Sequence, residues 1–387
     1  MTTASVAVIG GGVIGASVAY HLAARGWRDV VILDRSAGPG KGSTGRATGG
    51  FRAQYATPIN VRLSLLARQK LCRFEAETGV DPGYSQAGYL WLGAGEAELA
   101  ALREGQRVQR AEGLSEAVEV APDDVARLNP AIAGDGIAGG VFCPTDGFIK
   151  PLRMLEGYLA AGARLGVRAE WGTEATGFSL RGDGTISAVL TSRGPIGMAA
   201  AVNAAGPWAA TVAEWAGVAL PVTPLRRQAA ATVPCDLLPE AMPMTIFAGD
   251  GFHLRVRDGR VLLLWPTLGV EGRPFDCSVD PAWVRQVTAM AHQRVPVLRG
   301  VQVDPAACWA GLYEMSPDKH AILGPAPGCS NLFLVNGSSG HGVMHSPALG
   351  QLLAEIIADG TASSVDVHAL RPTRFAEGDP NPVSGVL

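Results

Sequence analysis

The sequence has little charge of either sign and almost no lysine. Charged residues make up 17% of the 387 positions, the formal net charge is -3, and lysine occurs only at Lys41, Lys70, Lys150 and Lys319. Nucleic acids and anionic membranes are bound through clustered Lys and Arg side chains, and no basic block occurs here. We therefore expect neither a nucleic-acid partner nor attachment to an anionic membrane.

Paired cysteines and long apolar runs are also missing. The six cysteines form no C-x-x-C pair and show no metal-ligand spacing, so we expect no metal site and a reduced, cytoplasmic protein. No cationic region precedes the first apolar run, which argues against a signal peptide. The longest weakly charged stretch, Ala199 to Leu220, contains Asn203, Pro207 and Glu214, which a membrane span rarely tolerates.

Glycine, by contrast, is abundant. It fills 50 of the 387 positions, about twice the average usage of roughly 7%, without a collagen-like period. Glycine lets the backbone turn sharply and approach a ligand closely. The apolar fraction of 47% is that of a folded protein, and the length allows about two domains.

The first glycine cluster has the spacing of a dinucleotide fingerprint. Gly10-Gly11-Gly12-Val13-Ile14-Gly15 matches G-x-G-x-x-G, follows the apolar run Ser5 to Ile9 and opens a helical pattern that ends near Gly26. Such a turn brings backbone N–H groups and the positive end of a helix to a pyrophosphate. Asp34 ends the next apolar run, where a carboxylate accepts hydrogen bonds from the adenosine ribose.

A second cluster selects the kind of dinucleotide. Residues 41–50, KGSTGRATGG, add further donors shortly after Asp34. A nicotinamide cofactor does not need them, whereas an extended FAD does, because its ribityl and pyrophosphate groups require more hydrogen bonds. No second G-x-G-x-x-G occurs, so we expect FAD that takes its electrons directly from the substrate.

The signals for nucleotide binding lie at the start, the middle and the end of the chain. They predict an α/β protein, α+β overall, in which a Rossmann-like FAD-binding domain is interleaved with a mixed-sheet substrate domain. The predicted FAD-binding segments are 1–80, 141–220 and 319–387, the last with a loose tail, and the predicted substrate segments are 81–140 and 221–318. The clearest predicted elements are helices over Pro58–Gly79 and Pro151–Leu165 and strands over Val261–Trp265 and Leu332–Val335.

Three further motifs carry a family resemblance. VNAAGPWA at 202–209, GLYEMSPDKHAILG at 311–324 and NGSSGHGVMHSPALG at 336–350 resemble signatures of the D-amino-acid oxidase superfamily of flavoproteins. With the N-terminal fingerprint they span nearly the whole chain in the same order. The nearest branch is similar to the sarcosine oxidase β-subunit, the proline dehydrogenase β-subunit and glycine oxidase.

The resemblance and the fingerprint together imply a set of FAD contacts. The Ala-Ala-Gly turn passes beside the nucleotide, and the loop before the last helix contacts the flavin. The predicted cofactor-binding residues are Gly10, Gly12, Val13, Ile14, Gly15, Asp34, Arg35, Ser43, Thr44, Arg46, Gly49, Gly50, Ala205, Gly206, Trp208, Gly311, Gly337, Ser339, Gly340, His341, Gly342 and Val343. Gly311 stands where monomeric sarcosine oxidase has its tethering cysteine, which implies that FAD is non-covalent here.

The predicted catalytic residues are Arg52, His253, Tyr313 and His341. Arg52 matches the arginine that pairs with the substrate carboxylate in sarcosine oxidases, a task that suits a bidentate guanidinium. Tyr313 stands where glycine oxidase has its clamping arginine, and His253 and His341 are candidates for favouring the neutral amine. Met344 replaces a lysine of monomeric sarcosine oxidase, which is a departure from that enzyme.

These residues predict an enzyme that oxidises a small amine, a secondary or N-methyl amino acid similar to sarcosine, proline or glycine, to an imine by hydride transfer to flavin N5. The alternatives are oxidation of a 2-hydroxy acid or of glycerol phosphate, and a flavin-carrying subunit that works only in a hetero-oligomer. We expect a dehydrogenase rather than an oxidase, with an electron acceptor other than oxygen, because Arg260 to Trp265 lacks the lysine that activates oxygen in monomeric sarcosine oxidase. A homo-oligomer is equally compatible with the sequence.

Overall fold

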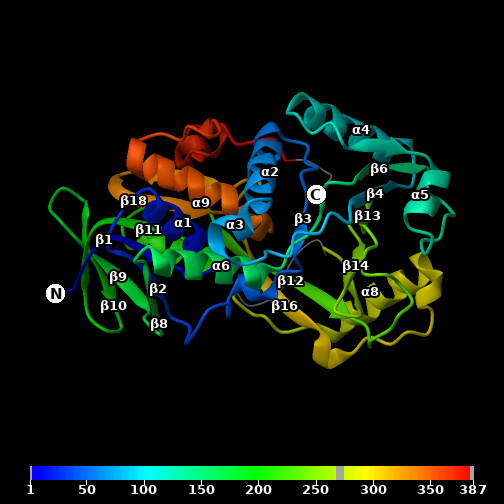
Figure 1. Cartoon of the computed structure of the whole chain (residues 1–387), viewed down its shortest axis with the longest axis horizontal. Coiled ribbons are helices and arrows are strands. Elements are labelled where there is room, and N and C mark those ends of the chain that lie inside the picture. The colour runs from blue at the N-terminus through cyan, green and yellow to red at the C-terminus, as the bar shows by residue number, and fades with distance from the viewer. Residues whose placement is uncertain (1, 267–273, 384–387) are drawn as a thin grey trace.

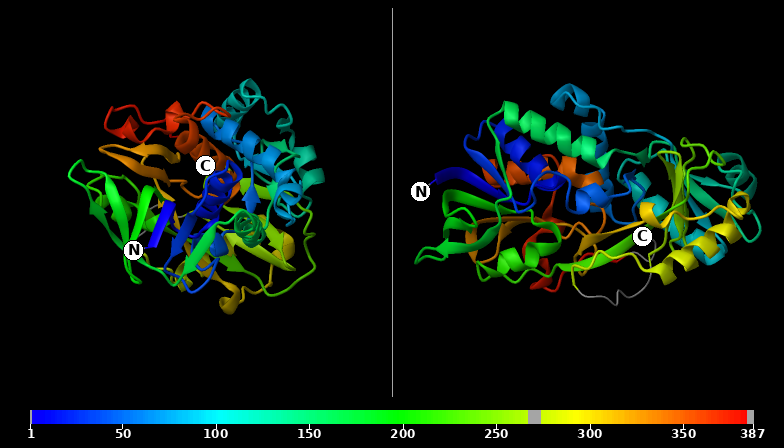
Figure 2. Two further views of the ribbon diagram at one scale, coloured as in Figure 1. Left: turned by 60° about the vertical axis from the view of Figure 1, so that its left-hand side comes forward. Right: turned by 90° about the horizontal axis from the view of Figure 1, so that it is seen from below.

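The computed structural model describes residues 2–266 and 274–383. Its described strands form two large mixed sheets and one short ladder, which confirms the predicted α/β and α+β character (Figure 1). The first sheet lies at the N-terminal side of the molecule and the second at the opposite side, with helix α2 between them (Figures 1 and 2).

The first sheet has the order β17-β18-β11-β1-β2-β8, and β10 and β9 extend it from β11. Its strands β1, β2, β8, β11 and β18 pair in parallel, as expected for a nucleotide-binding sheet. The bounds are β1 Thr2–Ile9, β2 Val30–Asp34, β8 Arg168–Trp171, β9 Ala175–Leu180, β10 Ile186–Thr191, β11 Ile196–Asn203, β17 Ile322–Ala326 and β18 Cys329–Asn336.

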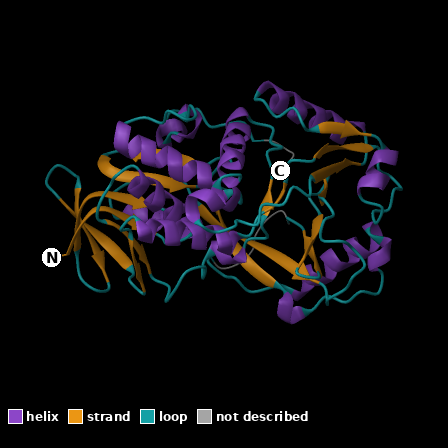
Figure 3. Ribbon diagram, in the orientation of Figure 1, coloured by secondary structure: helices purple, strands orange, loops and turns teal. Residues whose placement is uncertain are grey.

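Helices cover this sheet because its strands are apolar on both faces. The strands β1 and β2 read as near-continuous buried runs, and α1 packs against α6 and α9 over one face (Figure 3). The helices of this half are α1 Val13–Ala24, α2 Pro58–Leu71, α3 Phe74–Thr78, α6 Pro151–Arg164, α7 Ala209–Glu214 and α9 Gly342–Asp359.

The second sheet has the order β16-β12-β15-β14-β13-β4-β6-β5. It draws its strands from residues 89–143 and 223–315, and the ladder of β3 with β7 lies apart from both sheets. The bounds are β3 Gly50–Phe51, β4 Tyr89–Gly93, β5 Val118–Val120, β6 Gly139–Cys143, β7 Gly147–Phe148, β12 Thr223–Ala231, β13 Met244–Phe247, β14 His253–Arg257, β15 Arg260–Leu264 and β16 Trp309–Met315, with helices α4 Glu96–Ala111, α5 Pro122–Leu128 and α8 Pro281–Arg294.

The predicted elements form with adjusted ends. The helix predicted from Pro58 to Gly79 breaks into α2 and α3, and Gly79 ends α3 in the left-handed region with φ 75°. Thr57 precedes α2 but does not cap it with its side chain, because its hydroxyl group hydrogen-bonds His320 Nε2 at 2.8 Å. The division into interleaved domains at the predicted boundaries stays a prediction.

The C-terminal segment is better anchored than predicted. Asn381 donates two hydrogen bonds of 3.0 Å to the Asp318 carboxylate, so the loose tail expected from residue 376 onward is wrong for this part. The remaining residues, 384–387, lie outside the described part of the chain.

The sequence predicts no membrane span in the chain. Among the helices that the structure describes, none combines the length and the apolar character needed to cross a bilayer. The weakly charged stretch from Ala199 to Leu220 forms the end of β11, a 3-10 turn and α7.

Candidate functional site

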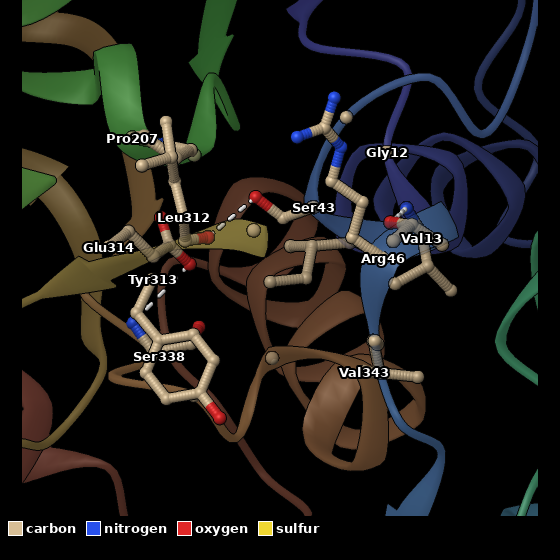
Figure 4. A pocket seen from close by; sticks show the side chains of 18 of the residues that line it. Gly12, Val13, Ser43, Arg46, Pro207, Leu312, Tyr313, Glu314, Ser338 and Val343 are labelled. Atoms are coloured by element: carbon tan, nitrogen blue, oxygen red, sulfur yellow. Dashed lines mark hydrogen bonds between the residues drawn. The ribbon is translucent and has the colours of Figure 1, made fainter. Parts of the chain in front are cut away.

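A pocket of about 650 Å³ gathers residues from both large sheets and from the loops that link them. Val13 and Val343 lie on one side of it, and Tyr313 and Glu314 on the other (Figure 4). Every predicted site residue lines this pocket except Gly15 and Gly337. The structure therefore brings together residues that are more than 300 positions apart in the chain.

The fingerprint turn forms one end of the pocket. The Gly10 N–H donates to Leu33 O at 2.9 Å and the Gly11 N–H to Asp34 Oδ2 at 2.8 Å. Gly10 has φ 111°, and a Cβ there would overlap the Ala204 carbonyl oxygen, so only glycine fits. Helix α1 then starts at Val13, so the N–H groups and the positive end of its first turn lie at the pocket.

Gly15 acts through packing rather than by lining the pocket. It lies in the first turn of α1, and a Cβ there would overlap the Gly10 carbonyl oxygen. Its missing side chain allows the helix to lie close to the turn, as expected for the third fingerprint glycine. Gly337 likewise packs beside Ser316, whose Cβ would lie 3.0 Å from a Cβ at Gly337.

The second glycine cluster forms a bridge to the other sheet. Ser43–Arg46 is a 3-10 turn, and Thr44 Oγ1 accepts a hydrogen bond of 3.1 Å from the Val13 N–H. The Ser43 hydroxyl group donates to Leu312 O at 2.8 Å (Figure 4), and the Arg46 guanidinium donates to Ala310 O at 2.8 Å. These bonds fix strand β16 beside the fingerprint.

The Ala-Ala-Gly turn closes the same end. The Ala204 N–H donates to Ile9 O at 2.9 Å, which holds the turn against β1. Pro207 lies near the start of the 3-10 helix Gly206–Trp208. The Arg35 guanidinium lies 4.0 Å above the Trp208 ring, so both residues flank the Asp34 carboxylate end of the pocket.

The loop between β18 and α9 is held by a buried glutamate that the sequence analysis missed. Ser339 N–H donates to Glu314 O at 3.0 Å, and Ser338 N–H donates to Glu314 Oε1 at 3.3 Å (Figure 4). Burial raises the pKa of Glu314 to about 7, although the hydrogen bonds from Ser338 and Gly337 act in the opposite direction. Glu314 is thus positioned to order the predicted flavin-contacting loop.

The predicted catalytic residues meet at the other end. Arg52 is buried, donates to Gln54 O at 2.7 Å, stacks 4.0 Å above the Tyr55 ring and has Nη2 3.4 Å from His341 Nε2. Tyr313 lies against Gly340, where an added Cβ would clash with its ring. His253 also lines this pocket, from the first residue of β14.

Both histidines predicted to be catalytic have lowered pKa values, which favours their neutral form at pH 7. Burial lowers the pKa of His253 to about 4, with the nearby Arg52 charge acting in the same direction. Burial and the Arg52 charge also hold the pKa of His341 well below its usual range. His345, the other histidine of the motif, lies 2.8 Å from the Ser64 hydroxyl group and does not line the pocket.

Arg227 and Lys319 line the pocket but are missing from the predicted site residues. Arg227 lies on β12 with its guanidinium 6.0 Å from the centre of the Tyr313 ring, and burial lowers its pKa. The alternation of side chains along a strand could have indicated this, because Arg226 binds Asp276 and Arg227 therefore lies on the opposite face of β12. Lys319, which adjoins Asp318 in the sequence, is exposed and lines the pocket, whereas Asp318 pairs with Arg374.

Comparisons with known proteins agree with this geometry. The family model described as "DAO: FAD dependent oxidoreductase" matches residues 5–356. The chain is 29% identical to FAD-dependent oxidoreductase domain-containing protein 1 of Xenopus laevis, over 97% of this chain and 83% of that protein. It is 28% identical to the glycine oxidase of Geobacillus kaustophilus (strain HTA426), over 91% of this chain and 92% of that enzyme. The crystal structure of L-proline dehydrogenase from P. horikoshii superposes with a TM-score of 0.90 at 26% identity, covering 98% of this chain and 100% of that one.

Proposed function

Because the chain belongs to the DAO family of FAD-dependent oxidoreductases, we propose that it oxidises the C–N bond of a small secondary or N-methyl amino acid to an imine. Bound FAD supplies the two-electron acceptor for this reaction. The observation that carries the proposal is the buried Arg52 guanidinium, which lies 3.4 Å from His341 Nε2 in the pocket that Tyr313 also lines. The similarity to a glycine oxidase and to an L-proline dehydrogenase supports an amino-acid substrate.

The pocket residues fit FAD at its adenosine and pyrophosphate end. The N-terminus of α1 offers N–H groups and positive potential to phosphate, and Asp34 offers a carboxylate at the end of β2. Gly10 carries no Cβ, and a Cβ built there would overlap the Ala204 carbonyl oxygen. We propose that Thr44, Ser43 and Arg46 complete this half of the site.

The substrate end provides charge recognition and a proton acceptor. We propose that Arg52 binds the carboxylate and that Tyr313 orients it. His253 Nδ1 lies 2.7 Å from Gly251 O, so this nitrogen carries the proton and Nε2 is the acceptor. A neutral histidine at this place favours the unprotonated amine, which must be present before the C–H bond is cleaved.

The test is anaerobic mixing of the purified yellow protein with a panel of small compounds. The panel contains sarcosine, proline, glycine, a 2-hydroxy acid and glycerol phosphate. We expect flavin absorbance to bleach with one of the amino acids and to stay unchanged with the last two. Bleaching by the hydroxy acid or the phosphate alone would replace the proposed substrate class, and bleaching only after a partner protein is added would indicate a subunit of a hetero-oligomer.

The cofactor is expected to be FAD bound without a covalent link. None of the described side chains that line the pocket is a cysteine. Gly311 has no side chain, and a Cβ built there would lie 3.1 Å from the Arg46 Cβ. The thiol nearest to Gly311 in the sequence, Cys308, donates to Asp304 O at 3.3 Å. Acid precipitation should therefore leave a colourless pellet and release FAD, identified by its mass. A yellow pellet, or FMN alone in the supernatant, would contradict this expectation.

We also propose that the enzyme is a dehydrogenase that reacts slowly with oxygen. Oxygen reduction passes through superoxide, which a buried cation stabilises strongly at low dielectric. Strand β15 contributes Leu264 to the pocket and contains no lysine, and His253 and His341 are neutral. The buried Arg52 is assigned to the substrate carboxylate. Protein reduced by its substrate should therefore be reoxidised far faster by a quinone or dye than by air-saturated buffer.

Lys319 provides the matched variant for this prediction, since it is an exposed lysine on the pocket wall. Reoxidation by oxygen should be equally slow in the wild-type protein and in Lys319→Met. Rapid reoxidation by oxygen that Lys319→Met abolishes would instead assign the enzyme as an oxidase with Lys319 as the activating cation.

A further inference from the structure

A second, much smaller cavity shares Arg52 with the main pocket. Its volume is about 20 Å³, taken as the space open to the centre of a water molecule, and Arg52 lines both cavities. Besides Arg52, its wall includes Gln54, Tyr55, Trp91, Gly105 and Gln109. These residues come from the segment after β3, from β4 and from α4, so the cavity lies where three separate parts of the chain meet.

Three buried polar atoms on this wall have no hydrogen-bond partner among the residues that the structure describes. They are Gln54 Oε1, Gln109 Oε1 and Trp91 Nε1, and their side chains are 4%, 5% and 2% exposed. Gln109 Nε2 already donates to Tyr55 O at 3.2 Å, which fixes Oε1 as the unpaired end of that amide. The wall thus presents two acceptors and one donor, and native proteins rarely bury such groups unpaired.

We propose that this cavity binds one ordered water molecule. A single water can donate its two hydrogens to Gln54 Oε1 and Gln109 Oε1 and accept the Trp91 indole N–H, which satisfies all three atoms. Its second lone pair then faces the Arg52 guanidinium on the shared wall. The volume agrees, because a buried water needs a cavity of roughly 10–15 Å³ and two to four polar partners.

Such a water positions Arg52 indirectly. The guanidinium rests on this wall through its bond to Gln54 O and its stacking 4.0 Å above Tyr55 and 5.3 Å from the centre of the Trp91 ring. The water cross-links Gln54, Trp91 and Gln109, the residues that support it. The consequence for substrate binding rests on the proposed function of Arg52, whereas the water site itself does not.

The direct test is a crystal structure of the FAD-loaded protein at a resolution where other buried waters are visible. We expect one density peak within about 2.7–3.2 Å of Gln54 Oε1, Gln109 Oε1 and Trp91 Nε1. A cavity without a peak in that map would overturn the proposal. This readout involves no substrate, so it stands or falls independently of the proposed reaction.

A thermal test uses Gly105, which lies inside α4 on the cavity wall. An added Cβ would meet Gln109 Nε2 at 3.6 Å and Ala56 Cβ at 3.9 Å, so alanine fits without a clash and displaces the water. The matched control is Gly162→Ala in α6, where the nearest atom is at 3.4 Å. Alanine favours a helix over glycine, so the control should raise the Tm. Gly105→Ala should lower the Tm or leave it unchanged, and a rise equal to that of the control would indicate a dry cavity.

The positioning role is tested by Trp91→Phe, which removes the only unpaired donor of the three. We expect KM for the best amino acid to rise several-fold while kcat at saturation and FAD content stay the same. An uncharged amine without a carboxylate should show no change. Unaltered KM for the amino acid would refute the positioning role.

Discussion

Replacing Arg52 by alanine is expected to weaken kcat/KM for the best amino-acid substrate by about 2 to 5 kcal/mol, the range for removing one partner of a desolvated charge pair. Arg52 is 6% exposed and lies between Gln54, Tyr55 and His341, so water cannot replace its contact with a substrate carboxylate at low cost. Steady-state kinetics with the amino acid that bleaches the flavin measures the effect.

Two controls separate charge recognition from local packing. Arg52→Lys keeps the charge and loses the planar fork, so it should recover only part of the activity. FAD content should hardly change in either variant, because Arg52 lies at the end of the pocket away from Asp34 and the fingerprint. If activity of the alanine variant on the amino acid stays within a few-fold, Arg52 is not the carboxylate site and the substrate need not carry one.

Replacing Arg374 by methionine is expected to cost about 3 to 5 kcal/mol of unfolding free energy, the range for leaving one charge of a buried pair uncompensated. Arg374 is fully buried and binds Asp318 through two hydrogen bonds of 2.8 and 3.0 Å, and its other N–H groups donate to Leu370 O, Arg371 O and His320 O. Denaturation should be followed at a fixed excess of FAD, since the bound cofactor adds to stability.

Arg371→Met is the matched control, because Arg371 lies three positions away and binds Glu377 and Asp379 at the surface. Exposed ion pairs contribute little, so its loss should be far smaller. The double variant Arg374→Met with Asp318→Asn should regain part of the stability, since it no longer buries a lone charge. Equal effects of Arg371→Met and Arg374→Met would show that burial of the pair does not matter.

The Asp318 pair also predicts a pH dependence. Burial alone would raise the pKa of Asp318, but the hydrogen bonds from Arg374 and Asn381 outweigh it and hold the pKa well below its usual range. Since the folded pKa lies below the unfolded value of about 3.9, the pair stabilises the fold above that pH. The stability difference between wild type and Arg374→Met should therefore be full at pH 7 and shrink as the pH falls below about 4.

Local patterns in the sequence determined the family and the cofactor, and they predicted most of the residues that line the pocket around the fingerprint. The fingerprint from Gly10 to Gly15 and the acid at Asp34 depend on short-range geometry, in which a strand, a turn and a helix follow each other within a few residues. Their roles can be predicted because the turn needs glycine wherever φ is positive or a Cβ would clash, and that requirement is visible in the residues themselves.

Tertiary structure alone decided which charges share the pocket with Arg52. Arg227, Glu314 and Lys319 lie far along the chain from Arg52. Strand alternation places Arg227 on the face opposite Arg226, but no sequence pattern states that this face meets Arg52 in one pocket. The pairing of Asp318 with Arg374 rather than Lys319 depends on where the C-terminal segment packs, and the neutral state of His253 and His341 depends on burial. Charge, protonation and cavities such as the one behind Arg52 arise from neighbours that are distant in sequence, so only the folded arrangement determines them.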